Sequence, residues 1–273
     1  MAHVVVPEAE ALLDKELPVL DKGFVRLVDY MGGDARVVQS ARVSYGAGTK
    51  TVREDAGLIN YLMKHGHTSP FEQVVLTFHV KTPIFVARQW VRHRTARMNE
   101  ISGRYSVMAD EFYVPQAEHV RPQSNKNRQG RSDDQLDASV QEEFLKTIEE
   151  DQIAAFRRYE SYLQQDVSRE LARINLPLSL YTQFYWQIDL HNLFHFLHLR
   201  LDSHAQLEIQ EYGKVIATCA EAVAPMSYAA FKEHSLSGVR LPGKTVRAVR
   251  DFLQKSDSDA ARQLLNLLNG DSK

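Results

Sequence analysis

Residues 73–81 read Gln-Val-Val-Leu-Thr-Phe-His-Val-Lys, and this stretch carries the clearest strand pattern in the chain. Every second residue is apolar: Val74, Leu76, Phe78 and Val80. A β-strand would place these four side chains on one face, which predicts a strand that is buried on that face. Pro83 follows at a position where proline is well tolerated, the first residue of a helix that we predict to continue to about Met98.

On the N-terminal side, the sequence predicts one further strand and two helices. Alternation over residues 23–31 predicts the strand. Residues 32–34, Gly-Gly-Asp, predict a turn and an N-cap for a helix that ends at Ser44. A second helix is predicted over residues 51–64, and Gly66 lies where a glycine in the left-handed conformation often ends a helix.

On the C-terminal side, helices dominate. Residues 115–137 are polar and predict a long surface loop. Helices are predicted at about residues 140–165, 169–175, 187–201, 204–222, 245–254 and 257–269, with Pro225 interrupting the pattern. These elements predict a helix-rich α+β fold, a single domain with a small, mainly antiparallel sheet. We expect this domain over residues 1–235, with the loop inserted at about 115–138, and a C-terminal helical extension over 236–273.

The composition is that of an ordinary soluble protein. Of the 273 residues 44% are hydrophobic and 25% are charged, which is enough to bury a sizeable core. The formal net charge of −2 gives no overall attraction to nucleic acid or to an anionic membrane. The single cysteine, Cys219, excludes an internal disulfide and fits a cytoplasmic protein. The apolar run at residues 3–6 is too short for a signal peptide, and no run reaches the roughly 18 apolar residues of a membrane span.

Residues 88–106 contain five arginines and one histidine but a single acid, Glu100. Crowded guanidinium groups repel one another unless anions lie between them, and their planar fork suits phosphate oxygens. On the predicted helix, Gln89, Arg92 and His93 share one face. The alternative is a solvated basic helix, or one that pairs with acidic neighbours. Because the segment ends in Ser-Gly-Arg-Tyr, whose backbone can approach an anion closely, we favour a phosphate or nucleotide site.

Eight positions of this segment resemble the signature of the flavin-dependent thymidylate synthases, the ThyX family. They are Arg92, His93, Arg94, Asn99, Glu100, Ser102, Arg104 and Tyr105. Further similarity lies at residues 66–72, 83–90 and 199–206, and the likeness covers most of residues 23–231. One departure is Arg97, where the family often has a smaller residue. The resemblance implies a ThyX-like fold.

The resemblance also implies an FAD site. The corresponding positions are Ser69, Arg92, His93, Arg94, Glu100, Asp189, Leu190, His191 and His195. The arginines would neutralise the pyrophosphate of FAD, and His93 would lie near the flavin. The family often carries asparagine or arginine in the stretch that here contains Asp189, His191 and His195.

A dUMP site is implied in the same way. The corresponding positions are Gln89, Trp90, Val91, Arg92, Glu100, Ile101, Ser102, Gly103, Arg104, Arg173 and Arg200. Ser102 and Arg104 suit the phosphate, which carries a charge of roughly −1.5 to −2. Arg200 is implied as the catalytic residue, which favours ionisation at N3 of the uracil. A cation there would stabilise the developing negative charge and make C5 a better nucleophile.

The implied reaction is the reductive methylation of dUMP to dTMP. NADPH would reduce FAD, methylenetetrahydrofolate would supply the carbon, the reduced flavin would supply the hydride, and tetrahydrofolate would leave. The order of these transfers and the folate-binding residues stay open. Family members build each site from several subunits, which implies a homotetramer, and the chain has no Gly-x-Gly-x-x-Gly motif of its own. We expect neither nucleic acid nor membrane as a partner.

Two other classes of function remain as alternatives. His191, His195 and His198 share one face of a predicted helix, which is a known zinc geometry, although no glutamate accompanies them. A binder of RNA or DNA would use the basic segment, but the near-neutral charge argues against it. Two single residues also have alternative roles. Ser102 as a nucleophile lacks a visible base, and Cys219 is expected in the core rather than in catalysis.

Overall fold

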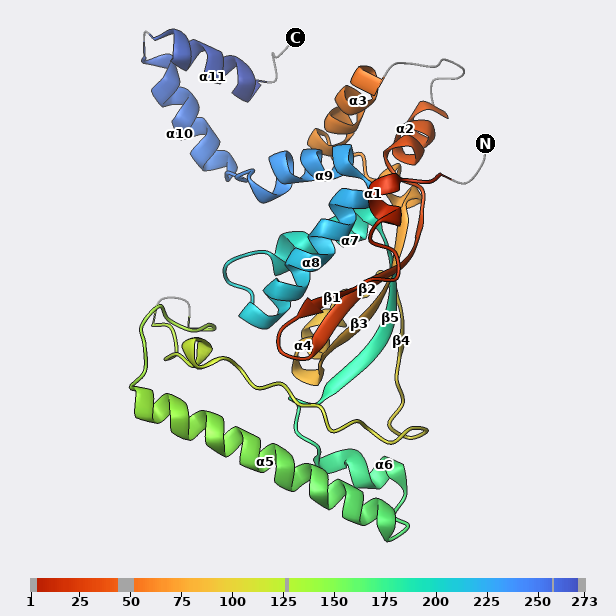
Figure 1. Ribbon diagram of the computed structural model, residues 1–273. Coiled ribbons are helices and arrows are strands. Elements are labelled where there is room, and N and C mark those ends of the chain that lie inside the picture. Colours follow the sequence, from red (N-terminus) through yellow and green to blue (C-terminus); the bar gives the residue numbers. More distant parts are fainter. Residues whose placement is uncertain (1–3, 44–51, 126–127, 257, 270–273) are drawn as a thin grey trace. The chain divides into compact units, whose positions relative to one another are not determined.

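The computed structural model describes residues 4–43, 52–125, 128–256 and 258–269. They belong to two compact units, Met1–Phe231 and Lys232–Lys273, which are described separately (Figure 1). The larger unit contains a five-stranded sheet and the helices up to α9 (Pro225–Phe231). The smaller unit contains two α-helices of the C-terminal tail.

An antiparallel sheet organises the larger unit. Across the sheet the strands are β1 (Glu16–Val19), β2 (Gly23–Met31), β3 (Val75–Pro83), β5 (Tyr181–Asp189) and β4 (Arg97–Glu100). All neighbouring pairs run antiparallel. The strands predicted at residues 23–31 and 73–81 are confirmed, although β3 begins and ends two residues later than expected. The three remaining strands were not predicted.

The main core lies where helices pack on the sheet. Helices α4 (Ile84–Trp90), α7 (Leu190–Arg200) and α8 (Leu207–Val223) contact strands β3, β5 and β2, respectively. The four apolar side chains of the predicted buried face are fully buried. Trp90 and Trp186 lie at the centre of this core with their ring centroids 5.2 Å apart, and Phe196 and Tyr212 surround them. Each ring buried in this way stabilises the fold by about 2–3 kcal/mol.

The predicted helix from Pro83 to about Met98 is wrong in its second half. Helix α4 ends at Trp90, a turn follows, and the chain then forms β4, which pairs with β5. Backbone hydrogen bonds to the edge of an existing sheet outweigh the local helix propensity of this segment. Arg92 and His93 therefore lie beyond the helix, and the helix face that they were expected to share with Gln89 does not form.

The described residues before β3 include three α-helices. They are α1 (Pro7–Glu10), α2 (Asp34–Arg42) and α3 (Val52–Lys64). The last two agree with the helices predicted through Ser44 and over residues 51–64, although residues 44–51 lie outside the described part of the chain. Gly66 has a φ angle of 69°, as expected for a glycine that follows a helix.

Asp34 joins two segments that are far apart in the sequence. It begins α2, yet its side chain does not cap that helix. Its carboxylate instead accepts hydrogen bonds from the backbone N–H groups of Met226 and Ser227, over 2.7 and 2.9 Å, at the start of α9. Pro225, predicted to interrupt a helix, is the first residue of this next one. Burial raises the pKa of Asp34, and these hydrogen bonds oppose the rise.

The remaining helices of the larger unit follow the prediction closely. They include α5 (Ala138–Gln164), α6 (Arg169–Ala172) and the short 3₁₀ helix η4 (Arg173–Asn175). Helix α7 begins three residues later than predicted, because residues 187–189 belong to β5. Helix α8, predicted over 204–222, also begins three residues later, at Leu207. The polar segment at residues 115–137 is mainly irregular, with a 3₁₀ turn, η3 (Ala117–His119), and one isolated bridge between Gln123 and Arg131.

The smaller unit is helical. It contains η5 (Lys232–Leu236), α10 (Gly243–Gln254) and α11 (Asp259–Asn269). The helices predicted at 245–254 and 257–269 correspond to α10 and α11, with residue 257 outside the described residues. Nη2 of Arg250 donates to the carbonyl of Leu268 over 2.7 Å and joins the two helices. Among all described residues, no helix combines the length and apolar character that crossing a bilayer requires.

Candidate active site

Arg200, the last residue of α7, is fixed by two hydrogen bonds. Its Nε donates to Nε2 of His93 over 3.0 Å, and its Nη2 donates to the backbone carbonyl of Gln89 over 3.1 Å. Burial lowers the pKa of the guanidinium, which nevertheless stays protonated at neutral pH. Because a guanidinium has five N–H groups, Arg200 retains donors for a ligand after making these two bonds.

His93 accepts this hydrogen bond as a neutral imidazole. Burial lowers the pKa of His93 to about 4, and the positive charge of Arg200 and the nearby His195 act in the same direction. The ring packs edge-on against Phe196, with centroids 4.8 Å apart. At neutral pH, His93 therefore carries its proton on Nδ1 and presents Nε2 to Arg200.

Gln89 contacts both ends of the turn that joins α7 to α8. Its carbonyl accepts from Arg200, and its Nε2 donates to Oε1 of Gln206 over 2.5 Å. Gln206 is the N-cap residue of α8. Gln206 was not among the predicted site residues, although it lies in the segment 199–206 that carries part of the family resemblance.

A cavity of about 360 Å³ lies beside β4 and β5. Four of the predicted substrate-binding residues line it: Glu100, Ile101, Gly103 and Arg173. Thr182 of β5 also lines the cavity, and its hydroxyl donates to Oε1 of Glu100 over 2.6 Å. Thr182 was missed by the sequence analysis, because β5 itself was not predicted.

Gly103 lies directly against Arg173. A Cβ atom on residue 103 would lie 2.9 Å from Sδ of Met108 and 3.0 Å from Cδ of Arg173. A side chain at this position would therefore displace its neighbours. Glycine therefore allows the backbone at residue 103 to lie close to the side chain of Arg173.

Ser102 and Arg104 lie next to this cavity. The hydroxyl of Ser102 accepts from the backbone N–H of Arg104 over 3.3 Å. Nε of Arg104 lies 3.4 Å from Oε2 of Glu170, and both side chains are more than half exposed. An exposed ion pair of this kind stabilises by less than about 1 kcal/mol, so a phosphate can compete with Glu170 for Arg104.

Arg92 and Arg94 are exposed cations close to His93 in the sequence. In the portion of the chain that the structure describes, neither guanidinium has an acidic partner. His195 is also exposed, and its ring centroid lies 5.9 Å from that of His93. Cations without acidic partners fit an anionic group such as the pyrophosphate of FAD.

The predicted flavin-side residues of α7 occupy different environments. Asp189 caps the helix, because its Oδ1 accepts from the backbone N–H of Asn192 over 2.9 Å. Its Oδ2 accepts from Nδ2 of Asn192 over 2.7 Å, so both oxygens are occupied. The side chain of Leu190 is fully buried, which leaves only its backbone for a ligand. His191 is half-buried, one turn before His195.

Ser69 lies on a separate exposed loop, which follows α3. The loop leads into the 3₁₀ helix η2 (Phe71–Gln73), which packs against α7. The rings of Phe71 and Phe194 lie 6.5 Å apart and make this connection. The loop that carries Ser69 and the helix that carries His191 are therefore held together by packing between η2 and α7.

Trp90 requires a correction. It was expected to bind the substrate, but its indole is fully buried, with the ring of Phe184 at 5.4 Å and that of Trp186 at 5.2 Å. The prediction can hold only for the backbone of Trp90, because the aromatic core encloses its side chain. Val91 follows as the half-buried C-cap of α4, at the point where the chain turns toward His93.

The alternatives that involve a metal or a thiol find little support. His191, His195 and His198 follow one another on α7, but among the described residues no group of three or more His, Cys, Asp or Glu side chains is placed to hold a metal ion. His204 instead bonds to Asp202 over 2.8 Å. Cys219 lies in the core, as expected, and burial raises the pKa of its thiol to about 12.

Comparison with known proteins places this site in a family. The pattern of the family described as "Thymidylate synthase complementing protein", Thy1, matches residues 26–226. A "Flavin-dependent thymidylate synthase" from Treponema denticola is 55% identical over 257 residues, which cover 94% of this chain and 97% of the relative. The chain belongs to the flavin-dependent thymidylate synthase family.

Two further comparisons support the assignment to the flavin-dependent thymidylate synthase family. A Thermus thermophilus relative of that name is 55% identical over 251 residues and matches 92% of this chain and 91% of its own length. A solved structure, the UMP/dUMP methylase PolB from Streptomyces cacaoi bound with 5-Br dUMP, is 31% identical with a TM-score of 0.73. The likeness covers 80% of this chain and 98% of PolB, and it confirms the expected fold.

Proposed function

We propose that the chain catalyses the reductive methylation of dUMP to dTMP, with FAD as the redox cofactor. Methylenetetrahydrofolate is the proposed carbon donor, and NADPH is the proposed reductant. The observation that carries the proposal is Arg200, which neutral His93 and the carbonyl of Gln89 hold in place beside the family signature. The names of the relatives support the flavin, and the ligand of PolB supports a uracil nucleotide.

The nucleotide site is proposed around the cavity and the turn beyond it. Ser102, Arg104 and Arg173 are assigned to the phosphate, because they supply a hydroxyl and two cations next to Gly103. The other positions assigned to dUMP are Gln89, Val91, Arg92, Glu100 and Ile101, together with the backbone of Trp90. A phosphate would replace the weak pairing of Arg104 with Glu170.

Arg200 is the proposed catalytic residue. Its free N–H groups would donate to the uracil near N3 and stabilise negative charge as that charge develops on the ring. His93 acts as a positioning residue, since its Nε2 fixes the orientation of the guanidinium. Removing one donor of this kind typically lowers kcat by about 10²–10³-fold.

The flavin site is proposed on the side of the cations and α7. When bound, FAD supplies the hydride chemistry. Arg92 and Arg94 would hold its pyrophosphate, because both cations are exposed and have no acidic partner among the described residues. The other assigned positions are Ser69, His93, Glu100, Asp189, Leu190, His191 and His195.

We also propose a cytoplasmic homotetramer with sites shared between subunits, and no nucleic acid or membrane partner. The exposed cations and the cavity beside β4 and β5 support this proposal, because a second copy could cover both. The catalytic domain is proposed to span residues 1–235, with 236–273 as a helical extension. Light scattering on the purified protein tests the assembly, and a fully active monomer would contradict it.

The decisive experiment is an anaerobic assay with the purified protein, FAD, NADPH, dUMP and methylenetetrahydrofolate. We expect dTMP and tetrahydrofolate in equal amounts, and no dTMP when FAD or dUMP is left out. A protein that binds flavin but forms no dTMP under these conditions would refute the proposal.

A further inference from the structure

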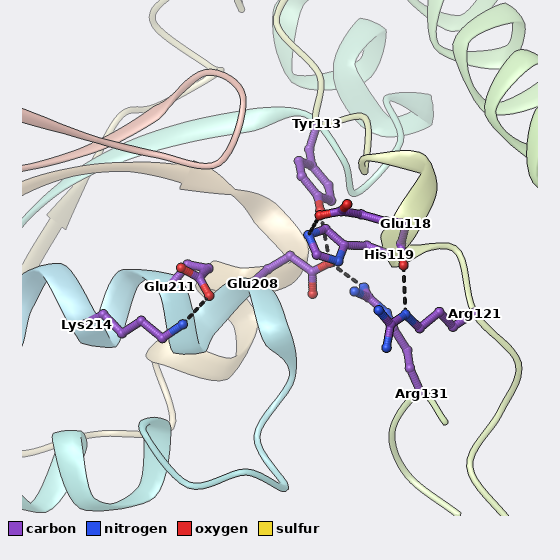
Figure 2. Close-up of polar contacts among 8 residues, drawn as sticks. All are labelled: Tyr113, Glu118, His119, Arg121, Arg131, Glu208, Glu211 and Lys214. Atoms are coloured by element: carbon purple, nitrogen blue, oxygen red, sulfur yellow. Dashed lines mark hydrogen bonds and ion pairs between the residues drawn. The ribbon is translucent and has the colours of Figure 1, made fainter. Parts of the chain in front are cut away.

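Glu208 is a fully buried carboxylate in the first turn of α8. Its side chain is 0% exposed, and such carboxylates are rarely buried unless they are paired. Its Oε1 accepts hydrogen bonds from Oη of Tyr113, over 3.0 Å, and from Nη2 of Arg131 (Figure 2). These three residues, the Glu208 cluster, are not among those assigned to the nucleotide or the flavin.

The cluster ties three segments of the larger unit together. Arg131 comes from the polar loop at 115–137, and its side chain is 32% exposed. Tyr113 precedes that loop and is anchored in turn, because its carbonyl accepts from Nε2 of Gln152 of α5 over 3.0 Å. The start of α8 is thus attached to the loop and to α5 through one carboxylate.

The charge of Arg131 keeps Glu208 ionised. Burial alone would raise the pKa of Glu208. The hydrogen bond and the positive charge of Arg131, together with hydrogen bonds from the backbone and from Gln206, outweigh burial, so the pKa lies below its usual value. Burial and the negative charge of Glu208 raise the pKa of Tyr113, which stays a neutral donor. The negative charge of Asp21, which lies between β1 and β2 in the sequence, also raises the pKa of Tyr113. His119 lies near the cluster in Figure 2 but pairs with Glu118 at 3.7 Å.

The first turn of α8 is connected to the catalytic arginine. Gln206, two residues before Glu208, accepts from Nε2 of Gln89 over 2.5 Å. The carbonyl of Gln89 in turn accepts from Arg200. A displacement of the start of α8 would therefore reach Arg200 through two hydrogen bonds.

We propose that the Glu208 cluster is a positioning device for the nucleotide site: it fixes the first turn of α8, so that Gln206 holds Gln89 and Gln89 holds Arg200. The inference rests on the proposed function, since Gln89 and Arg200 are assigned to dUMP there. It gives the polar loop a defined task, which is to supply the cation that keeps a buried carboxylate in place.

Arg131→Gln tests this by leaving Glu208 without its cation. At low pH the carboxyl is protonated and the cluster stays closed, whereas at high pH the unpaired carboxylate moves toward water and draws Gln206 away from Gln89. We therefore compare dUMP affinity at about pH 6 and about pH 8 in the flavin-loaded proteins. On raising the pH, the affinity of the variant should fall about tenfold more than that of the parent protein. Calorimetry measures this affinity without turnover.

Two further variants separate positioning from general stability. In Arg131→Gln/Glu208→Gln the buried group is neutral, so the extra pH dependence should vanish and the affinity should return to within about threefold of the parent. Gln206→Ala leaves the contacts of Glu208 with Tyr113 and Arg131 in place, but it removes the bond to Gln89 and the side-chain hydrogen bond of Gln206 to Glu208. It should weaken dUMP binding by about fivefold at both pH values, with FAD still bound.

Matched controls lie on the same two elements. Arg121 is on the same loop, but its Nε donates to the carbonyl of Glu118 over 2.7 Å (Figure 2). Glu211 is one turn along α8 and pairs with Lys214 at 2.6 Å on the surface. Arg121→Gln and Glu211→Gln should bind dUMP as the parent does at both pH values.

The outcomes distinguish the inference from the proposed function. If Arg131→Gln melts earlier but keeps the parental pH profile of dUMP binding, the cluster only holds the fold and the inference is wrong. If Arg131→Gln does not fold, Gln206→Ala decides, because unchanged dUMP affinity in that variant overturns the inference. A parent protein that makes no dTMP refutes the proposed function, whereas the binding test still applies.

Discussion

Acidification should weaken the fold through His93, and the size of the effect follows from the environment of this ring. The pKa of His93 falls from 6.5 to about 4. At about 1.4 kcal/mol per pH unit, the full shift would correspond to about 3 kcal/mol. Because the ring is only half-buried, solvent screening reduces this to about 1–2 kcal/mol.

The sign follows from where protons bind. As the pH falls below 6.5, the unfolded chain takes up a proton at residue 93, whereas the folded chain resists it until about pH 4. Stability contributed by neutral His93 is therefore fully present above pH 6.5 and is lost progressively down to about pH 4. Protonation also removes the acceptor for Nε of Arg200.

The matched variant is His93→Gln, since the glutamine amide oxygen can accept from Arg200 but does not titrate. Urea unfolding of both proteins gives the free energy of unfolding at several pH values. The other histidines contribute equally to both curves, so the difference between them isolates residue 93. Between pH 6.5 and about pH 4, the free energy of unfolding of the parent should fall by about 1–2 kcal/mol more than that of His93→Gln. Parallel curves would show that His93 titrates as an ordinary exposed histidine and would refute the reasoning.

Three more changes have defined expected results. Arg200→Ala should lower the rate of dTMP formation by about 10²–10³-fold or more while FAD stays bound, as judged by the assay and by flavin absorbance; normal turnover would contradict the assigned role. Gly103→Ala should raise the KM for dUMP by about tenfold or more, because the new methyl group lies 3.0 Å from Cδ of Arg173. An unchanged KM would mean that Arg173 does not contact the nucleotide. Asp34→Ala should lower the free energy of unfolding by about 2–3 kcal/mol, because it leaves two backbone N–H groups and the hydroxyl of Ser227 without their acceptor. Thermal unfolding measures this loss, and a change below about 0.5 kcal/mol would contradict it.

Strands could be predicted from the sequence where one face is apolar and turn residues mark both ends of the strand. Strand β3 meets both conditions, and its buried face is as expected. Strand β5 has a similar alternation, with Phe184, Trp186 and Ile188 buried. It runs without a break into the apolar helix α7, however, so helical periodicity was extended over its last residues. The alternating pattern was present, but no turn residue marked where it ended.

The site was predictable in its residue types but not in its contacts. A dense arginine segment indicated an anion site, and the structure places Gly103 and Arg173 together on one cavity. The bond between Arg200 and His93 joins residues 107 positions apart, which local pattern alone cannot pair. The burial of Trp90 was not predictable either, because membership in a motif does not distinguish a side chain that binds a ligand from one that supports the fold.

The choice of a neutral acceptor for Arg200 has a chemical consequence. A carboxylate at the position of His93 would fix the guanidinium more strongly, but it would also offset the positive charge that the uracil needs. Nε2 of neutral His93 and the carbonyl of Gln89 orient the guanidinium of Arg200 and leave its net charge intact. The lowered pKa of His93 keeps this arrangement at physiological pH, since a protonated ring would repel Arg200. The acidic anchor is instead Glu208, paired with Arg131 and linked to Arg200 through the hydrogen bonds of Gln206 and Gln89, so it can fix position without neutralising the catalytic cation.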